Sequence, residues 1–132
     1  MNNTIDLWHR FIKTSTPDER IQLLNQTLDD DVVFYSPVVY TPQQGKKMTI
    51  KYLMGAAMIL NHNFKYTKEL ISKESAVLEF ECTIDDIIVE GVDIITMDSD
   101  SGLIKAFKVM IRPLQAMNIV HQKMGVLLAG AK

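Results

Sequence analysis

The chain has 132 residues, a mass of 15.0 kDa and a formal net charge of −2, with 47% hydrophobic and 23% charged residues. This length predicts one domain spanning residues 1–132, and the slightly acidic balance excludes the basic surface that nucleic-acid binding needs. A single cysteine, no signal-peptide pattern and no apolar run long enough to cross a membrane together predict a cytoplasmic soluble protein without nucleic-acid or membrane partners.

Apolar spacing and turn residues predict the elements in chain order as helix, helix, short strand, helix, four strands and helix. Thr16-Pro17-Asp18-Glu19 combines a cap, a proline at the first position and a glutamate three residues after the cap, which is typical of a helix start. The expected helices cover residues 5–14, 17–28, 47–60 and 114–129. The expected strands cover 32–35 and 64–72, and three more lie within 74–113.

The first turn inside 74–113 is expected at Asp85-Asp86. A two-residue turn there makes a hairpin in which Leu78 lies opposite Asp93. Because alternate residues of a strand share a face, Asp93 is then an acid on an otherwise apolar face. Cys82 lies on the same face and is expected to be a buried, unreactive thiol.

The second turn is expected at residues 98–102, which are rich in turn formers. Pairing Met97 with Ile104 across it sets Asp93 opposite Lys108. The same face then continues toward one rim through Met110 and Arg112. A shift of one residue in the register of this strand pair would instead place Lys105, Phe107 and Val109 on this face.

The opposite face of these strands mixes apolar and charged side chains. Its expected residues are Val92, Ile94, Phe107, Val109 and Ile111 beside Glu79, Glu81 and Lys105. A half-apolar outer face usually has something packed against it, and a second copy of the sheet is the simplest cover. We therefore expect a homodimer formed through the outer sheet face.

The order of elements predicts an α+β fold, a curved antiparallel sheet with helices packed on its concave face. The space between them is expected to hold the large apolar side chains Trp8, Phe11, Phe34, Tyr40, Met54, Met58, Phe80 and Met110. These side chains either fill the interior completely or line a pocket for a small apolar molecule. The eight methionines favour an adaptable pocket.

Short motifs along nearly the whole chain match one known group of proteins. They are residues 28–34 followed by Pro37, Gly45 before the third helix, Gly91-Val92-Asp93, and the turn at 98–102. In these the chain resembles the nuclear transport factor 2-like superfamily, and within it the SnoaL-like polyketide cyclases and ketosteroid isomerases. The resemblance implies a cone of curved sheet and helices, often dimeric through the sheet, with an apolar pocket inside.

The chain departs from the catalytic patterns that the resemblance implies. Asp93 falls where the isomerases have an acid that helps to hold an oxyanion, and where related epoxide hydrolases have a catalytic aspartate. Phe11 corresponds to the isomerases' tyrosine, and Ser36 to their general base. Gly91 stands where the hydrolases have an arginine. Neither isomerase nor epoxide hydrolase activity is predicted, and Ser36 is expected to line the pocket.

Asp93 supports two different interpretations. Burial without a partner would raise its pKa and make it a hydrogen-bond donor or a general acid/base. An ion pair with Lys108 would instead keep it ionised and structural. Arg112 could bind an anion at the rim or pair with a nearby carboxylate.

The sequence thus predicts a protein that binds a small apolar molecule in an internal cone pocket without a complete known catalytic set. One alternative is an isomerase, cyclase or hydrolase in which Asp93 transfers a proton and Lys108 steadies negative charge. The other is a module that binds a protein through the outer sheet face. No cofactor is implied, and no histidines or acids have the spacing of a metal site.

Overall fold

The structure is a computed structural model, and it describes residues 3–130. Its helices are α1 (Asn3–Lys13), α2 (Pro17–Thr27), α3 (Lys46–Ile59) and α4 (Leu114–Gly130). Its strands are β1 (Leu28–Tyr35), β2 (Gln43–Gln44), β3 (Lys65–Ile71), β4 (Ser75–Ile84), β5 (Ile87–Met97) and β6 (Ile104–Arg112). The predicted helices and strands are all present; β1 begins four residues earlier than expected, and β2 was not predicted.

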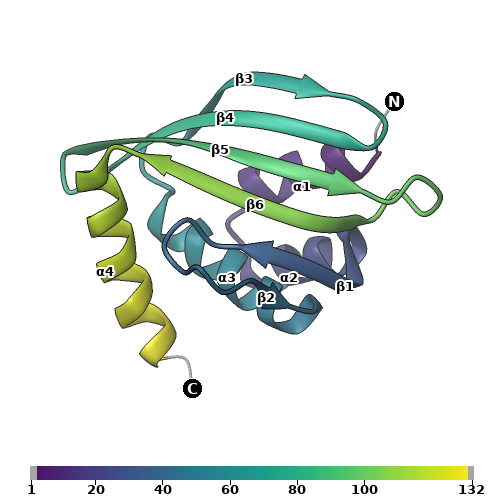
Figure 1. The fold of residues 1–132 in the computed structure, drawn as a ribbon, viewed down its shortest axis with the longest axis horizontal. Helices are drawn as coiled ribbons and strands as arrows, with labels where there is room; N and C mark the ends of the chain where they lie inside the picture. Colours follow the sequence, from purple (N-terminus) through teal and green to yellow (C-terminus); the bar gives the residue numbers. More distant parts are fainter. Residues whose placement is uncertain (1–2, 131–132) are drawn as a thin grey trace.

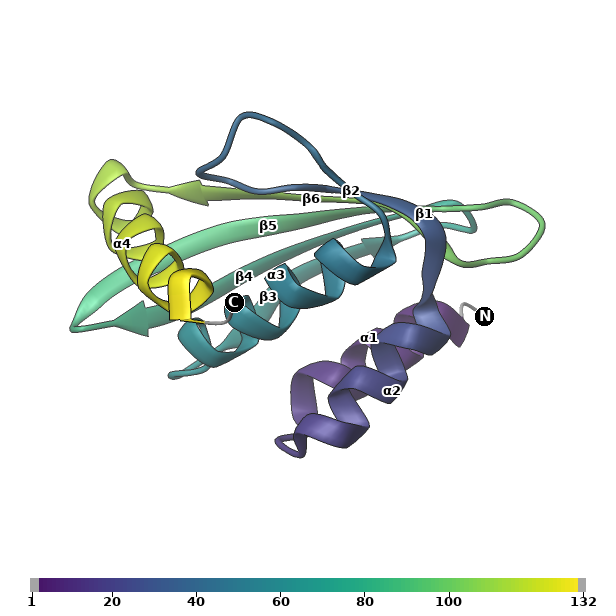
Figure 2. The same cartoon turned by 90° about the horizontal axis from the view of Figure 1, so that it is seen from below.

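The six strands form one curved sheet in the order β2-β1-β6-β5-β4-β3 (Figure 1). All neighbours are antiparallel except β1 and β6, which are parallel. The helices lie on one side of the sheet, and α4 crosses one end of it (Figure 2). The predicted α+β architecture is confirmed, with one parallel pair in the sheet.

The first two helices form a hairpin against the concave face. The inward stripe of α1 consists of Ile5, Trp8 and Phe11, all of them buried. Pro17 opens α2 as predicted, but the side chain of Thr16 makes no capping hydrogen bond. The hydroxyl of Thr14 instead donates to Glu19 over 2.6 Å, which ties the loop to the first turn of α2.

The β4–β5 hairpin has the predicted register, with Leu78 opposite Asp93. Its turn residues Asp85 and Asp86 both have positive φ, 50° and 67°, which is the backbone of a type I′ turn. Cys82 is buried as predicted, and burial raises the pKa of its thiol to about 11. The hairpin therefore places Asp93 on the inner face.

The β5–β6 register differs from the prediction by one residue over most of its length. Met97 does pair with Ile104, but the next pair is Thr96 with Ala106. A bulge therefore leaves Lys105 unpaired and exchanges the faces of all later β6 residues. The side chains that point inward are Phe107, Val109 and Ile111, which were expected on the outer face. The side chains that point outward are Lys108, Met110 and Arg112, which were expected on the inner face.

The ring of Phe80 lies across Gly91 on the neighbouring strand. A Cβ on Gly91 would lie 2.8 Å from Cε2 of Phe80 and 2.9 Å from the carbonyl oxygen of Met110. Real Cβ atoms essentially never approach other atoms so closely. The ring of Phe80 can therefore occupy this position only because residue 91 is a glycine.

The side of α4 that faces the protein is apolar. Its buried residues are Ala116, Val120 and Met124, whereas His121 is exposed. Across residues 3–130, every helix is too short or too polar to cross a lipid bilayer.

Candidate functional site

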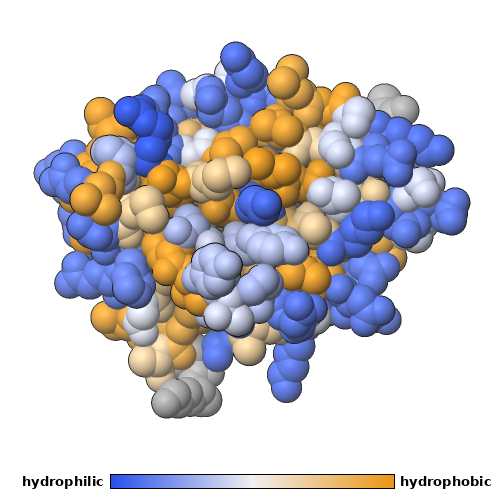
Figure 3. Space-filling view, viewed as in Figure 1, coloured by the Kyte–Doolittle hydropathy of each residue, from blue (hydrophilic) through white to orange (hydrophobic). Residues whose placement is uncertain are grey.

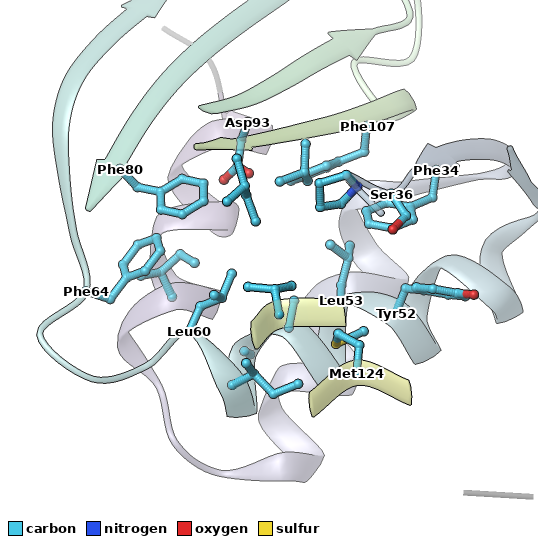
Figure 4. A pocket seen from close by; sticks show the side chains of 18 of the residues that line it. Phe34, Ser36, Tyr52, Leu53, Leu60, Phe64, Phe80, Asp93, Phe107 and Met124 are labelled. Atoms are coloured by element: carbon cyan, nitrogen blue, oxygen red, sulfur yellow. The ribbon is translucent and has the colours of Figure 1, made fainter. Parts of the chain in front are cut away.

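A cavity of about 190 Å³ lies between the concave face of the sheet and the helices. Residues of β1, β4, β5, β6 and all four helices contribute to its wall. Most of these side chains are apolar or aromatic, and Figure 4 shows Phe34, Phe64, Phe80 and Phe107 arranged around the open space. Such a cavity excludes strongly hydrated ligands and accepts apolar ones.

The carboxyl group of Asp93 lies at one side of this cavity, with its oxygens turned toward the open space (Figure 4). The side chain is buried, at 6% exposure, and among the described residues no lysine, arginine or histidine forms an ion pair with it. Burial without a counter-charge disfavours the ionised form. It raises the pKa of Asp93 from 3.8 to about 7, against the opposing effect of one hydrogen bond from Tyr66.

A chain of two hydrogen bonds fixes one oxygen of this carboxyl. The indole Nε1 of Trp8 donates to the hydroxyl of Tyr66 over 2.8 Å, and that hydroxyl donates to Oδ2 of Asp93 over 2.6 Å. Burial, and next the charge of Asp93, raise the pKa of Tyr66 well above its usual value. Tyr66 therefore stays protonated and acts as a permanent donor to Asp93.

The second carboxyl oxygen, Oδ1, has no hydrogen-bond partner among the described residues. Because burial raises the pKa of Asp93 to about 7, the carboxyl can be protonated or ionised near neutral pH, and it can offer either a donor or an acceptor to a ligand oxygen. A mostly apolar cavity with one buried acid, Asp93, is the chemistry present at this site.

Six of the residues predicted for the site do line the cavity: Trp8, Phe11, Phe34, Ser36, Phe80 and Asp93. The other six do not: Tyr40, Met54, Met58, Lys108, Met110 and Arg112. Tyr40 is fully exposed in its loop, and Met58 is exposed on the outer side of α3. Met54 packs partly buried against the core without reaching the cavity.

The predicted pairing of Asp93 with Lys108 is wrong. Because of the β6 bulge, Asp93 lies opposite Val109, and Lys108 stands on the outer face with its Nζ 5.0 Å from the ring centre of Tyr35. Arg112, also outside, forms an ion pair with Glu90 on the neighbouring strand. Neither cation can therefore steady charge at Asp93.

Several lining residues were missed by the sequence reasoning. They are Arg20, Tyr52, Phe64, Phe107, Val109, Ile111 and Met124 among others. Tyr66, the hydrogen-bond partner of Asp93, was also missed. A tight turn between β3 and β4 would pair Thr67, not Tyr66, with Phe80; a bulge between Tyr66 and Lys68 changes this.

Solved structures with the same arrangement come from several bacteria. A steroid delta-isomerase from Pseudomonas aeruginosa is 30% identical, with a TM-score of 0.87 over 98% of this chain and 91% of that chain. The chain belongs to the nuclear transport factor 2-like, SnoaL-like superfamily. No family model and no curated protein matches the sequence.

Other members of the superfamily share the fold at lower identity. An uncharacterised protein with a cystatin-like fold from Silicibacter pomeroyi is 25% identical, with a TM-score of 0.85 over 96% of this chain and 85% of that chain. A putative SnoaL-like polyketide cyclase from Shewanella denitrificans is 18% identical, with a TM-score of 0.64 over 92% of this chain and 98% of that chain. The resemblance read from the sequence is thereby confirmed.

The superfamily comparison clarifies one departure noted in the sequence. Phe11 offers no hydroxyl to the cavity, and the hydroxyl that reaches Asp93 is that of Tyr66 on β3. Within residues 3–130, no group of three or more histidine, cysteine or acidic side chains is placed to hold a metal ion. Asp93 is the only acid in the cavity wall as described.

The raised pKa of Asp93 predicts a specific pH dependence of stability. Between about pH 4 and pH 7 the folded state binds this proton and the unfolded state releases it. The free energy of unfolding therefore falls as pH rises through this window, by up to about 4 kcal/mol, and levels off above it. Urea titrations of the wild type and of Asp93→Asn, measured across pH, isolate this term because all other carboxyls are shared. Parallel stability curves for the two proteins would contradict the assignment.

Proposed function

We propose that this protein binds a small, largely apolar molecule in its internal cavity, with one oxygen of the ligand hydrogen-bonded to Asp93. The observation behind the proposal is the unpartnered Oδ1 of a buried carboxyl facing an apolar cavity. Oδ1 faces the cavity and is free to pair with a ligand hydroxyl or carbonyl, and a hydrogen bond in apolar surroundings is stronger than the same bond in water.

The volume of the cavity limits the size of the ligand. Apolar cavities of about 150 Å³ take up benzene, and this one measures about 190 Å³. A molecule of one or two rings, or a short chain that extends toward solvent, matches that space. One oxygen of the ligand would lie next to Asp93, and its apolar part against aromatic and aliphatic side chains.

Binding without turnover is favoured by the composition of the cavity wall. Among its described residues there is one acid, Asp93, and no histidine, lysine or cysteine. Ser36 corresponds to a general base, but its hydroxyl is a weak base and accepts a hydrogen bond from the backbone N–H of Val38. A reaction that needs a separate acid and base finds one carboxyl group and no histidine or lysine in this wall.

A second candidate is an isomerase-type enzyme, and one observation favours it. Asp93 has a pKa of about 7, which is suited to accepting a proton and returning it, and a 30% identical neighbour is a steroid delta-isomerase. In this candidate Asp93 alone would move a proton between two carbons of an enone. Isomerisation of a β,γ-unsaturated ketone that disappears in Asp93→Asn would favour it over binding alone.

The ligand oxygen can be tested with 2-naphthol and naphthalene, which share their rings and differ by one hydroxyl. We expect the wild type to bind 2-naphthol about tenfold more tightly, because the hydroxyl pairs with Oδ1 of Asp93. In Asp93→Leu this preference should fall below about twofold, while naphthalene still binds. Fluorescence titration measures both ligands.

The outcomes of this titration separate the alternatives. No binding of either ring compound to the wild type would contradict a ligand cavity. An unchanged preference for 2-naphthol in Asp93→Leu would contradict the role of the carboxyl. Retained naphthalene binding shows that the variant is folded with its cavity intact.

We also propose that the outer face of the sheet pairs with a second copy of the chain. The face is crossed by an apolar band (Figure 3). Two cross-strand pairs contribute apolar side chains to this face: Val77 with Ile94, and Val92 with Met110. Met110 is 50% exposed. An exposed apolar sheet face of this kind is typical of an interface between identical subunits.

Light scattering tests the dimer. We expect a mass of twice 15.0 kDa for the wild type, and dissociation in Met110→Glu because a buried unpaired carboxylate opposes association. Val126→Glu, a matched change at an exposed apolar residue of α4, should leave the mass unchanged. A wild-type mass of 15.0 kDa at all concentrations would contradict the proposal.

A further inference from the structure

Arg20 is the only positively charged residue in the cavity wall as described. It lies in the first turns of α2 and is partly exposed, so it stands where the cavity meets solvent. Asp93, by contrast, is buried. The two charged groups of the wall thus differ in depth: the acid is inside and the cation is at the edge.

The guanidinium of Arg20 is held in position but is not neutralised. Its Nε donates to the backbone carbonyl of Thr14 over 2.9 Å, and its central carbon lies 5.7 Å from the ring centre of Phe11, which itself lines the cavity. Among the described residues no carboxylate forms an ion pair with it. The nearby Glu19 is bonded to the hydroxyl of Thr14.

The contacts of Arg20 leave most of its hydrogen-bonding capacity unused. A guanidinium has five N–H donors in a planar fork that matches a carboxylate. One of the five, on Nε, has a partner within the described residues. The hydrogen bond to Thr14 accounts for the orientation of the side chain, and the remaining donors are available to a ligand.

We propose that the ligand is an amphiphile with a carboxylate at one end and a neutral oxygen elsewhere. Arg20 binds the carboxylate at the edge of the cavity, and the neutral oxygen of the ligand reaches Asp93. This inference rests on the proposed ligand-binding function and narrows its chemical class. The opposite orientation is disfavoured, because a carboxylate beside Asp93 would be desolvated next to a second acid without a counter-charge.

The matched probes are ω-hydroxydecanoate and its methyl ester, which share the chain and the hydroxyl and differ in charge. The proteins are the wild type, Arg20→Met, which keeps the apolar stem, and Arg20→Lys, which keeps the charge without the planar fork. We expect Arg20→Met to weaken binding of the carboxylate about tenfold and that of the ester less than about twofold. The affinity of Arg20→Lys for the carboxylate should lie between that of the wild type and that of Arg20→Met. Calorimetric titration at pH 7 gives each Kd.

Ester binding serves as the control for an intact cavity in every variant, since Arg20→Met also removes the hydrogen bond to Thr14. Equal effects of Arg20→Met on both probes, or none on either, would overturn the anionic class while leaving the ligand cavity in place. Failure of both probes and of 2-naphthol to bind the wild type would overturn the proposed function together with this inference.

Discussion

The burial of one carboxyl group within the concave face of the sheet is the constraint on which the rest of the site depends. Asp93 faces apolar and aromatic side chains, has no counter-ion among the described residues, and is held by one hydrogen bond from Tyr66. A structure retains such a costly group only if its neighbours are arranged for it. The bond from Trp8 to Tyr66 orients the one donor that fixes Oδ2, and Oδ1 is left toward the cavity. The hydrogen bonds that hold Asp93, on β5, therefore come from side chains on α1 and β3.

The shape of the cavity follows from small irregularities in the sheet. The bulge at Lys105 turns Phe107, Val109 and Ile111 inward, so the wall beside Asp93 is apolar rather than basic. The absence of a side chain at Gly91 leaves room for the ring of Phe80 beside it. The walls enclose a space of about 190 Å³, where a fully packed interior was the alternative.

The sequence predicted whatever depends on local signals. The type I′ turn at Asp85-Asp86 fixed the β4–β5 register and placed Asp93 inside, and proline and apolar spacing located the helices. It failed where a one-residue bulge intervenes, because period-two alternation gives no warning of an extra residue. One bulge moved Lys108 outside and another brought Tyr66 inside. Both bulges concern the partners of Asp93, so the sequence located the acid but left open which of its two interpretations holds. Arg20 was missed because helical spacing does not say which polar residue borders a cavity.

The titration of Asp93 itself tests this account most directly. The carboxyl carbon of Asp93, assigned by comparison with Asp93→Asn, can be followed by NMR across pH in the folded protein. A buried carboxyl facing an apolar cavity with a single donor predicts a midpoint near 7. A midpoint at or below that of a free aspartate would mean that water or a cation reaches the group, and the site described here would not exist in solution.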